Sequence, residues 1–265
     1  MSKRLEGKVA VITGGGGVGQ AIVEKFVREG ATVAVVDFSQ ANLDLTMKAI
    51  EALGGTGIGV LTDVSNEQAV IDMAAAVAKA YGKIDVLVNT AAVPDPTAAL
   101  IDLKLEDWNK IFAVDLVGTM LCSREVVRFM IPAKSGSIIN IGAEGGRAGD
   151  GRGGYPMRAG YCSAKMGVIG LTETLSREVG KDGIRVNCVS PAGVNGERFR
   201  TVVIGGRAKA QGISYEAALA DEVSKYSLGR VVEPMEIANL VAFLASDEAS
   251  GITGQTIPVN CGLHW

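Results

Sequence analysis

Histidine is almost missing from this chain, because His264 is the only one among its 265 residues. A Ser-His-Asp triad or a metal site with several histidine ligands is therefore not expected. The four cysteines, Cys122, Cys162, Cys188 and Cys261, form no C-x-x-C pair and match no metal-site spacing. We expect four free, buried thiols and no bound metal.

Blocks of basic residues and long apolar runs are also missing. The formal net charge is −3, with acidic and basic residues interspersed, which argues against nucleic acid as a partner. No apolar run reaches the roughly 18 residues that span a bilayer. The N-terminus lacks the apolar stretch and cleavage site of a signal peptide. We expect a cytoplasmic protein that binds a small molecule, and neither nucleic acid nor a membrane.

Short runs rich in valine and isoleucine alternate with helical patterns along the chain. The predicted strands are Val9–Thr13, Thr32–Asp37, Gly57–Thr62, Val86–Asn89, Ser137–Ile141, Arg185–Val189 and Thr256–Val259. The predicted helices are Gln20–Glu29, Asn42–Leu53, Glu67–Tyr81, Trp108–Met130, Gly160–Val179 and Pro234–Leu244. This alternation predicts an α/β fold with a doubly wound, Rossmann-like parallel sheet of about seven strands and helices on both faces.

No linker divides the chain, so residues 1–265 are expected to form one domain. Four helices are expected to end at glycines, because glycine accepts the left-handed conformation that closes a helix. These are Gly30, Gly54, Gly82 and Gly180. The longest stretch outside the alternation covers about residues 192–230, and its length suggests a lid over a site.

The first predicted strand runs into the loop TGGGGVG at residues 13–19, in which Gly14, Gly16 and Gly19 fit the pattern G-x-G-x-x-G. Such glycines let a backbone approach a pyrophosphate, although a glycine-rich turn can also be only a turn. Asp37 ends the second predicted strand, where a carboxylate accepts hydrogen bonds from ribose hydroxyls and repels a 2′-phosphate. The two features together favour NAD(H) over NADP(H).

Tyr161 and Lys165 stand four residues apart and therefore share one face of a predicted helix. A tyrosine hydroxyl is a poor acid or base at neutral pH unless a nearby cation stabilises the phenolate. The pair follows the fifth predicted strand, close to where the carboxyl ends of parallel strands open into a cleft. It is a candidate acid/base pair; the alternative is a surface tyrosine beside a solvated lysine.

With these residues in place, the chain resembles the short-chain dehydrogenase/reductase family along almost its whole length. The matching motifs follow the family's order: the glycine loop at Thr13–Gly19, Asp37, the acidic step Asp63–Val64, VNTAA at Val88–Ala92, YCSAK at Tyr161–Lys165, RVNCVSPAG at Arg185–Gly193, and ITGQTIPVNCG at residues 252–262.

The resemblance implies an NAD(H)-dependent alcohol dehydrogenase or ketoreductase acting on a secondary alcohol or its ketone, as a homo-oligomer, either a dimer or a homotetramer. It implies that Lys165 binds the nicotinamide ribose and stabilises the phenolate of Tyr161, which exchanges a proton with the substrate oxygen. The implied cofactor-binding residues are Gly14, Gly16, Gly17, Val18, Gly19, Asp37, Phe38, Asp63, Val64, Asn89, Ala91, Tyr161, Lys165, Pro191 and Val194.

The chain departs from the family pattern at several positions. The glycine loop is one residue shorter, so that Gly14, Gly17 and Gly19 are the matching glycines. The family's N-N-A-G appears as N-T-A-A at residues 89–92. Asp115 replaces a helix asparagine and is expected to take part in the proton path.

The largest departure is Ala143, which stands where the family has a catalytic serine and has no hydroxyl to hold the substrate oxygen. Glu144 is the first candidate to replace that hydroxyl, followed by Thr90 and Ser163. A carboxylate cannot donate a hydrogen bond, so Glu144 would have to be protonated, act through water, or bind a substrate hydroxyl. The alternative function is an NAD-binding protein whose catalysis is weak or lost.

Five arginines lie in segments that are expected to border the substrate. Three precede Tyr161 and two lie at the start of the expected lid: Arg147, Arg152, Arg158, Arg198 and Arg200. Guanidinium groups suit carboxylates and phosphates, which indicates an anionic or highly polar substrate. Ion pairs with neighbouring acids, or plain solvation, are the favoured alternative, because surface arginines in flexible loops are common. A cyclic or sugar-like alcohol stays open.

Overall fold

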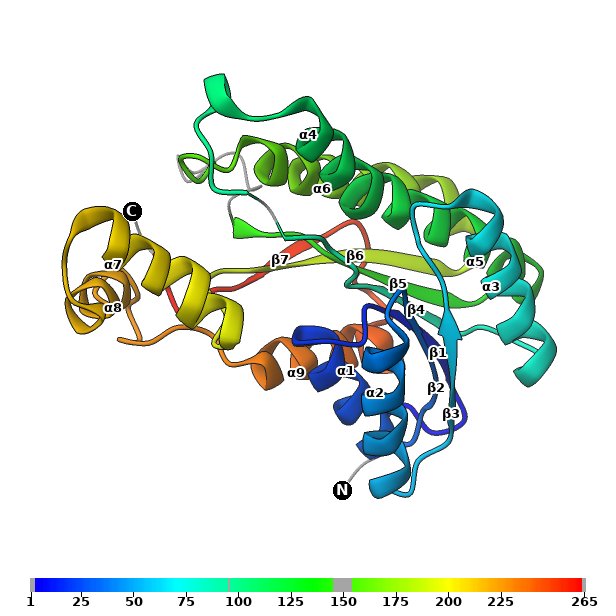
Figure 1. The fold of residues 1–265 in the computed structure, drawn as a ribbon. Coiled ribbons are helices and arrows are strands. Elements are labelled where there is room, and N and C mark those ends of the chain that lie inside the picture. The colour runs from blue at the N-terminus through cyan, green and yellow to red at the C-terminus, as the bar shows by residue number, and fades with distance from the viewer. Residues whose placement is uncertain (1–2, 95, 145–153, 264–265) are drawn as a thin grey trace.

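A seven-stranded sheet forms the centre of the protein, and all of its neighbouring strands are parallel (Figure 1). The computed structural model describes residues 3–94, 96–144 and 154–263. The strand order is β3-β2-β1-β4-β5-β6-β7. The strands are β1 Val9–Thr13, β2 Thr32–Asp37, β3 Gly57–Leu61, β4 Val86–Asn89, β5 Gly136–Ile141, β6 Ile184–Pro191 and β7 Thr256–Val259. The predicted α/β fold and its seven strands are confirmed.

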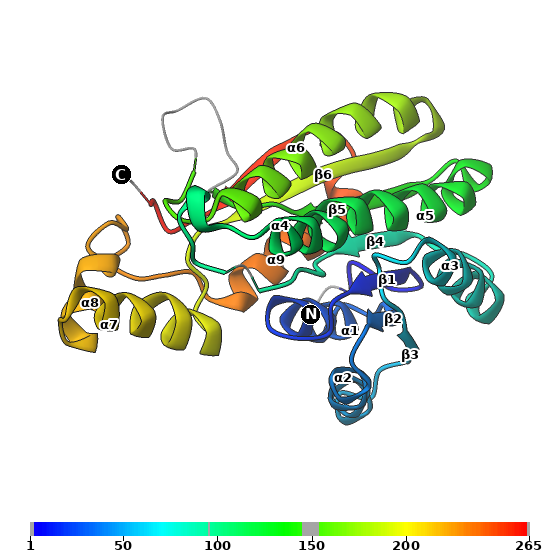
Figure 2. The same cartoon turned by 45° about the horizontal axis from the view of Figure 1, so that its top comes forward.

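Helices cover both faces of the sheet, as Figures 1 and 2 show. One face carries α1 Val18–Arg28, α2 Gln40–Ala52 and α9 Pro234–Ala245. The other carries α3 Glu67–Tyr81, α4 Leu105–Ile111, α5 Thr119–Ala133 and α6 Ala159–Val179. The strands are apolar on both sides because each face is buried under helices, which is why the runs of valine and isoleucine do not alternate with polar residues.

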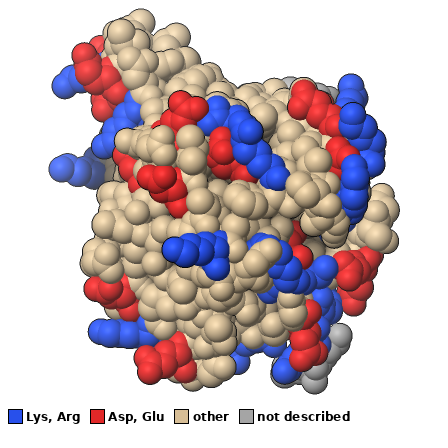
Figure 3. Space-filling view, turned by 90° about the vertical axis from the view of Figure 1, so that its right-hand side faces the viewer, with Lys and Arg blue, Asp and Glu red and all other residues tan. Residues whose placement is uncertain are grey.

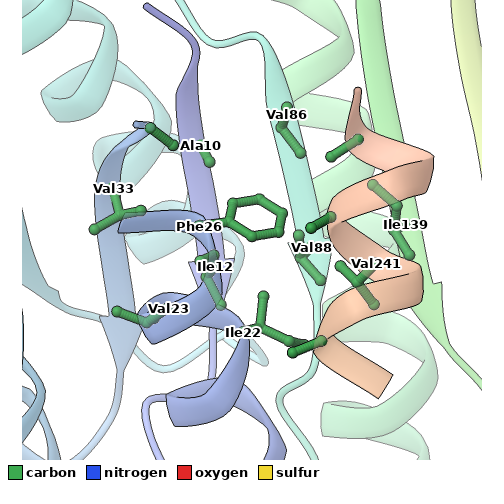
Figure 4. Packing of buried hydrophobic residues seen from close by; sticks show 14 of the residues in the cluster. Ala10, Ile12, Ile22, Val23, Phe26, Val33, Val86, Val88, Ile139 and Val241 are labelled. Atoms are coloured by element: carbon green, nitrogen blue, oxygen red, sulfur yellow. The ribbon is translucent and has the colours of Figure 1, made fainter. Parts of the chain in front are cut away.

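Phe26 of α1 is fully buried between the sheet and α9, beside Ile12, Val88 and Val241 (Figure 4). Truncation of a buried phenylalanine costs about 3–5 kcal/mol, because both the apolar contacts and the filled volume are lost. We expect Phe26→Ala to lower the free energy of unfolding by that amount in urea denaturation. Phe38→Ala is the matched control, since that ring is 76% exposed. Equal losses in the two variants would contradict this packing.

The helix predicted at Trp108–Met130 is not a continuous α-helix. Helix α4 passes into a π-helical turn at Phe112–Gly118 before α5 begins at Thr119. A π-helical turn adds one residue to a helical turn and is frequent at functional sites. Here it places Asp115 and Gly118 in the interior, and the Thr119 hydroxyl donates to the Asp115 carbonyl at 2.9 Å.

Three of the four glycines predicted to close helices have the expected positive φ: Gly30 at 90°, Gly54 at 66° and Gly82 at 75°. The prediction for Gly180 was wrong. That residue has φ −59°, and the chain continues from α6 into a 3-10 turn at Gly180–Asp182. Gly183, with φ 73°, is the left-handed residue that ends it. The sequence offered two nearby glycines, and helical periodicity did not distinguish between them.

The segment 192–230 is more helical than its sequence predicted. It contains a π-helical turn at Phe199–Gly205, α7 Gly206–Gln211 and α8 Tyr215–Val223. These helices bury a small apolar cluster of their own, composed of Phe199, Ile204, Ala208 and Ala218. In Figure 1 they lie beyond the carboxyl ends of the central strands, apart from the helices that cover the sheet.

Backbone hydrogen bonds connect both ends of this segment to the rest of the fold, among them those of Ser227 with Gly262 and of Leu228 with Cys261. The amide of Asn195 donates to the carbonyl of Val232 at 2.7 Å, and the amide of Val232 donates to the carbonyl of Gly193 at 2.9 Å.

In the described part of the chain, no helix is long and apolar enough to cross a bilayer. On the face in Figure 3, acidic and basic side chains lie beside one another.

Candidate active site

The glycine loop between β1 and α1 lies against the end of β4. A Cβ atom on Gly14 would lie 3.0 Å from Thr90 Oγ1 and 3.1 Å from Ala91 Cα, and φ at Gly14 is 84°. A Cβ atom on Gly19 would lie only 1.8 Å from the carbonyl oxygen of Gly14. Glycine is therefore required at both positions by the folding of the loop itself.

The outer side of the same loop is open. A Cβ atom on Gly17 would meet nothing within 4 Å, and one on Gly16 would meet only Asn42 Nδ2 at 3.9 Å. Gly17 precedes α1, which begins at Val18, and no side chain caps this helix. Backbone N–H groups at a helix N-terminus attract anions. The open side of the loop could hold a dinucleotide pyrophosphate, and this role of the glycines stays a prediction.

Asp37 is held beside this loop at the end of β2. Its side chain is nearly buried, and its Oδ2 accepts a hydrogen bond from the Gly15 amide at 2.7 Å. Oδ1 accepts the Ser39 amide at 2.8 Å, and Asn42 Nδ2 lies 3.3 Å from Oδ2. Asn42 was missed by the sequence analysis, because only the fold brings the first turn of α2 back to Asp37. The arrangement presents a carboxylate where a ribose would follow a pyrophosphate.

The remaining predicted cofactor residues lie along the carboxyl ends of the strands. Phe38 and Asp63 are exposed, whereas Val64 is buried. Pro191 is buried at the end of β6, and Val194 pairs with Val232. These positions form a line from the adenosine side of the glycine loop toward the segment 192–230.

Asn89 and Ala91 form hydrogen bonds that hold the carboxyl end of β4 to its neighbours. Asn89 is buried, and its Nδ2 donates to Asn140 Oδ1 at 2.8 Å and to Ser123 Oγ at 3.1 Å. The amide of Ala91 donates to Thr13 Oγ1 at 3.2 Å. Asn89 therefore holds the end of β4 against β5 and α5.

Tyr161 and Lys165 lie on the first turns of α6, where the structure brings them together with Asp115. Lys165 is only 4% exposed; its Nζ donates to the carbonyl of Ile141 at 3.1 Å and lies 3.5 Å from Asp115 Oδ2. The same Nζ is 5.9 Å from the centre of the Tyr161 ring. A solvated lysine beside a surface tyrosine is thereby ruled out.

Asp115 is fully buried in the π-helical turn. Its Oδ1 accepts a hydrogen bond from the Val93 amide at 3.0 Å. Burial raises the pKa of the Asp115 carboxyl, and the Lys165 ammonium acts in the opposite direction. The acid that replaces a helix asparagine thus forms a buried ion pair with Lys165.

Ala143 and Glu144 follow β5 and are both buried. Glu144 Oε2 accepts a hydrogen bond from Asn260 Nδ2 at 3.2 Å, which ties it to the C-terminal segment after β7. Of the other two candidates for the missing hydroxyl, the Thr90 hydroxyl donates to the carbonyl of Thr13, and Ser163 is exposed on α6.

Arg158 lies at the start of α6 with its Cζ 4.3 Å from the centre of the Tyr161 ring and 5.8 Å from that of Tyr155. Burial raises the pKa of the Tyr155 hydroxyl. The sequence analysis did not predict Tyr155 as a residue near the site, because a single tyrosine in a glycine-rich segment matches no functional motif.

The other arginines divide into two groups. Arg198 is exposed, and its charge is the smallest of the influences that oppose the raised pKa of the Asp115 carboxyl. Arg200 donates to Asn195 Oδ1 at 3.1 Å. Arg147 and Arg152 fall outside the described residues.

The cysteines do not form a reactive or metal-binding group. Cys122, Cys162 and Cys188 are buried as predicted, whereas Cys261 is half-buried, so the prediction for it was wrong. It follows β7 on a turn with φ 48°. Burial raises the pKa of Cys122 to about 12 and that of Cys188 to about 11, which disfavours their thiolates. Among the residues that the structure describes, no three histidine, cysteine or acidic side chains converge as metal ligands.

Comparisons with known proteins agree with this geometry. The family described as enoyl-(acyl carrier protein) reductase matches residues 13–264. A 3-oxoacyl-(acyl-carrier-protein) reductase of Thermotoga maritima is 38% identical over 98% of this chain and 99% of its own length. Meso-2,3-butanediol dehydrogenase of Serratia marcescens is 35% identical over 98% of this chain and 95% of its own length.

Solved structures give the same picture. NAD+-bound xylitol dehydrogenase superposes with a TM-score of 0.91 at 27% identity, covering 98% of this chain and 100% of that one. Levodione reductase superposes with a TM-score of 0.89 at 28% identity, covering 98% of both chains. This chain belongs to the short-chain dehydrogenase/reductase family and is an oxidoreductase of alcohol and ketone substrates.

Proposed function

We propose that this protein is an NAD(H)-dependent oxidoreductase that interconverts a secondary alcohol and its ketone, with Tyr161 as the acid/base. The observation that carries the proposal is the placement of Lys165, buried between Asp115, the Ile141 carbonyl and the Tyr161 ring. This group lies at the carboxyl ends of β4 and β5, the edge that also holds the glycine loop, where open α/β sheets bind their ligands.

Tyr161 would exchange a proton with the substrate oxygen, and Lys165 would favour the phenolate and contact the nicotinamide ribose. A bound nicotinamide would supply or accept the hydride. Asp115 would keep the ammonium of Lys165 oriented, because its own carboxylate is fixed by the Val93 amide. We place Asp115 in the path by which protons reach Tyr161, with Lys165 between the two.

The preference for NAD(H) rests on Asp37, whose carboxylate is fixed beside the glycine loop by the Gly15 and Ser39 amides. We expect Asp37→Ala to lower the ratio of kcat/KM with NADH to that with NADPH by at least about tenfold, or about 1.4 kcal/mol. Charge repulsion of the 2′-phosphate and the ribose hydrogen bonds would both be lost. Steady-state rates with each cofactor measure this ratio.

Asp44→Ala is the matched control, because it removes the same charge from an exposed site on α2. It should leave the ratio unchanged. An Asp37→Ala enzyme with the wild-type cofactor ratio would rule out this role of Asp37.

For the substrate we propose a polar secondary alcohol or ketone, with polyols, cyclic diols and hydroxy acids as the first compounds to assay. The names of two relatives, xylitol dehydrogenase and meso-2,3-butanediol dehydrogenase, support polyols and diols. Arg158 beside the phenol, and Arg198, whose charge acts on Asp115, support a polar or acidic molecule. NADH absorbance across such a panel tests the proposal.

We further propose that residues 192–230 act as a lid. Their separate apolar cluster and their position beyond the carboxyl ends of the strands support this. A homo-oligomer, dimer or tetramer, is supported by partly exposed apolar side chains on α5, the preceding π-helical turn and α6. These are Val117, Phe129, Ile131 and Met166.

A second candidate function is NAD binding with weak or lost catalysis. Ala143 favours it, because the hydroxyl of the family's catalytic serine is missing at this position. The buried Lys165–Asp115 pair argues against it, because a protein that only binds the nucleotide does not need a buried ion pair beside the phenol.

A further inference from the structure

The proposed reaction places a developing negative charge on one substrate oxygen. As a hydride adds to the carbonyl carbon, the electron pair of the C=O bond moves onto the oxygen, and Tyr161 gives its proton to that oxygen. A second hydrogen-bond donor at the same oxygen stabilises this charge and contributes about 10²–10³ in rate. The identity of this donor rests on the proposed function.

The side chains that the sequence suggested as replacements for the missing serine hydroxyl do not supply such a donor. Ala143 has no hydroxyl, and the Thr90 hydroxyl already donates to the carbonyl of Thr13 behind the glycine loop. Ser163 is exposed two residues beyond Tyr161, and helical residues so spaced do not face each other.

Glu144 is adjacent but has the wrong chemistry. Its Oε2 accepts a hydrogen bond from the side-chain amide of Asn260, which holds the carboxyl group toward the C-terminal segment. An ionised carboxylate has only acceptor oxygens and would repel a developing alkoxide. Lys165 is also engaged, since its ammonium donates to the Ile141 carbonyl and lies beside Asp115.

Arg158 lies against the reacting phenol. Its guanidinium carbon lies 4.3 Å from the centre of the Tyr161 ring, and the ring of Tyr155 lies 5.8 Å away, so two aromatic rings orient it. A guanidinium carries five N–H donors in a planar fork and keeps its charge at all working pH values. It can therefore donate to a substrate oxygen while keeping its other contacts.

The charges around Tyr161 come from several elements. Arg158 caps the N-terminus of α6 and Lys165 lies on its second turn, and both contact the Tyr161 ring. Asp115 pairs with Lys165 from the π-helical turn. The charge of Arg198 acts on Asp115, and that of Glu144 acts on Tyr155. Lys165 is balanced by the buried carboxylate of Asp115 at 3.5 Å. Arg158 lies closer to the centre of the Tyr161 ring than Lys165 does, at 4.3 Å against 5.9 Å.

The geometry points to Arg158 as a catalytic residue that donates a hydrogen bond to the substrate oxygen, in the place where Ala143 leaves no donor. Tyr161 transfers the proton, and Arg158 keeps all of its own protons. The same contact holds the alkoxide that forms when an alcohol is oxidised.

The first experiment compares Arg158→Ala and Arg158→Lys with the wild type. We expect Arg158→Ala to lower kcat by about 10²–10³-fold with little change in the Kd for NADH, because the lost contact acts on the transition state. Lysine still donates, so Arg158→Lys should retain at least about tenfold more activity than Arg158→Ala. Equal activity in the two variants would overturn the inference. Arg177→Ala, an exposed site at the far end of α6, is the matched control.

The second experiment restores a hydroxyl. Ala143→Ser in the Arg158→Ala background should raise kcat at least about tenfold, whereas in the wild type it should change kcat by less than about threefold. No gain in the Arg158→Ala background, or the same gain in both backgrounds, would overturn the inference. Thermal unfolding with NADH identifies a misfolded double variant, and in that case the lysine comparison decides.

The substrate panel separates this role from carboxylate binding. Arg158→Ala should slow neutral and acidic alcohols by the same factor, because the reacting oxygen is common to both. A loss confined to acidic alcohols would assign Arg158 to the substrate's charge and overturn the inference. A wild-type protein that binds no NADH and oxidises no alcohol would overturn the proposed function as well, whereas a fast Arg158→Ala enzyme would overturn only this step.

Discussion

Tyr161→Phe should lower kcat and kcat/KM by about 10³-fold, while the Kd for NADH stays within about threefold of the wild type. Phenylalanine keeps the ring that lies 4.3 Å from Arg158 and removes only the hydroxyl. Lys165 keeps its contacts with Asp115 and Ile141, so the cofactor side of the site is preserved. A change that acts only in the transition state lowers kcat and kcat/KM together.

Stopped-flow reduction and a fluorescence titration with NADH measure the two quantities separately. Tyr81→Phe is the control, because it removes a tyrosine hydroxyl from the end of α3, away from the site. A Tyr161→Phe enzyme that keeps a tenth of the wild-type rate would show that another group moves the proton.

Gly19→Ala should weaken NADH binding by at least about 100-fold, equivalent to about 2.7 kcal/mol. The new Cβ atom would lie 1.8 Å from the carbonyl oxygen of Gly14, and this neighbour is backbone, so the loop has to move. The loop then loses the shape that lets backbone N–H groups surround a pyrophosphate. A fluorescence titration with NADH measures the loss.

Gly170→Ala is the matched control, because this exposed glycine of α6 has open space where a Cβ atom would be added. It should bind NADH like the wild type and be at least as stable, since alanine favours the helix. A Gly19→Ala protein that binds NADH normally would contradict the placement of the cofactor on this loop.

The sheet was predictable because its central strands are buried on both faces and therefore appear in the sequence as short apolar runs, whereas the edge strands β3 and β7 are partly exposed. Each such run in β1 and β4 is fully buried. The helix boundaries were less predictable. The π-helical turn at Phe112–Gly118 shifts the pattern by a single residue, which a period of 3.6 does not resolve.

The candidate site was predictable where its residues are close in sequence. Tyr161 and Lys165 are one helical turn apart, and Gly14 to Gly19 form one loop, so the motifs contain their own geometry. Contacts between distant segments were not predictable. Glu144 meets Asn260 across 116 positions, and Asn42 returns to Asp37 only once α2 packs beside β2. Arg158 appeared in the sequence as one of several loop arginines, and only the fold shows it on the phenol ring.

A crystal structure with NAD+ and a slowly oxidised alcohol measures most directly whether the phenol faces the nicotinamide. We expect the pyrophosphate on residues 13–19, Asp37 on the adenosine ribose, and the Tyr161 hydroxyl hydrogen-bonded to the alcohol oxygen beside the nicotinamide C4. A nicotinamide bound away from Tyr161, with the alcohol oxygen out of reach of its hydroxyl, would contradict the proposed chemistry.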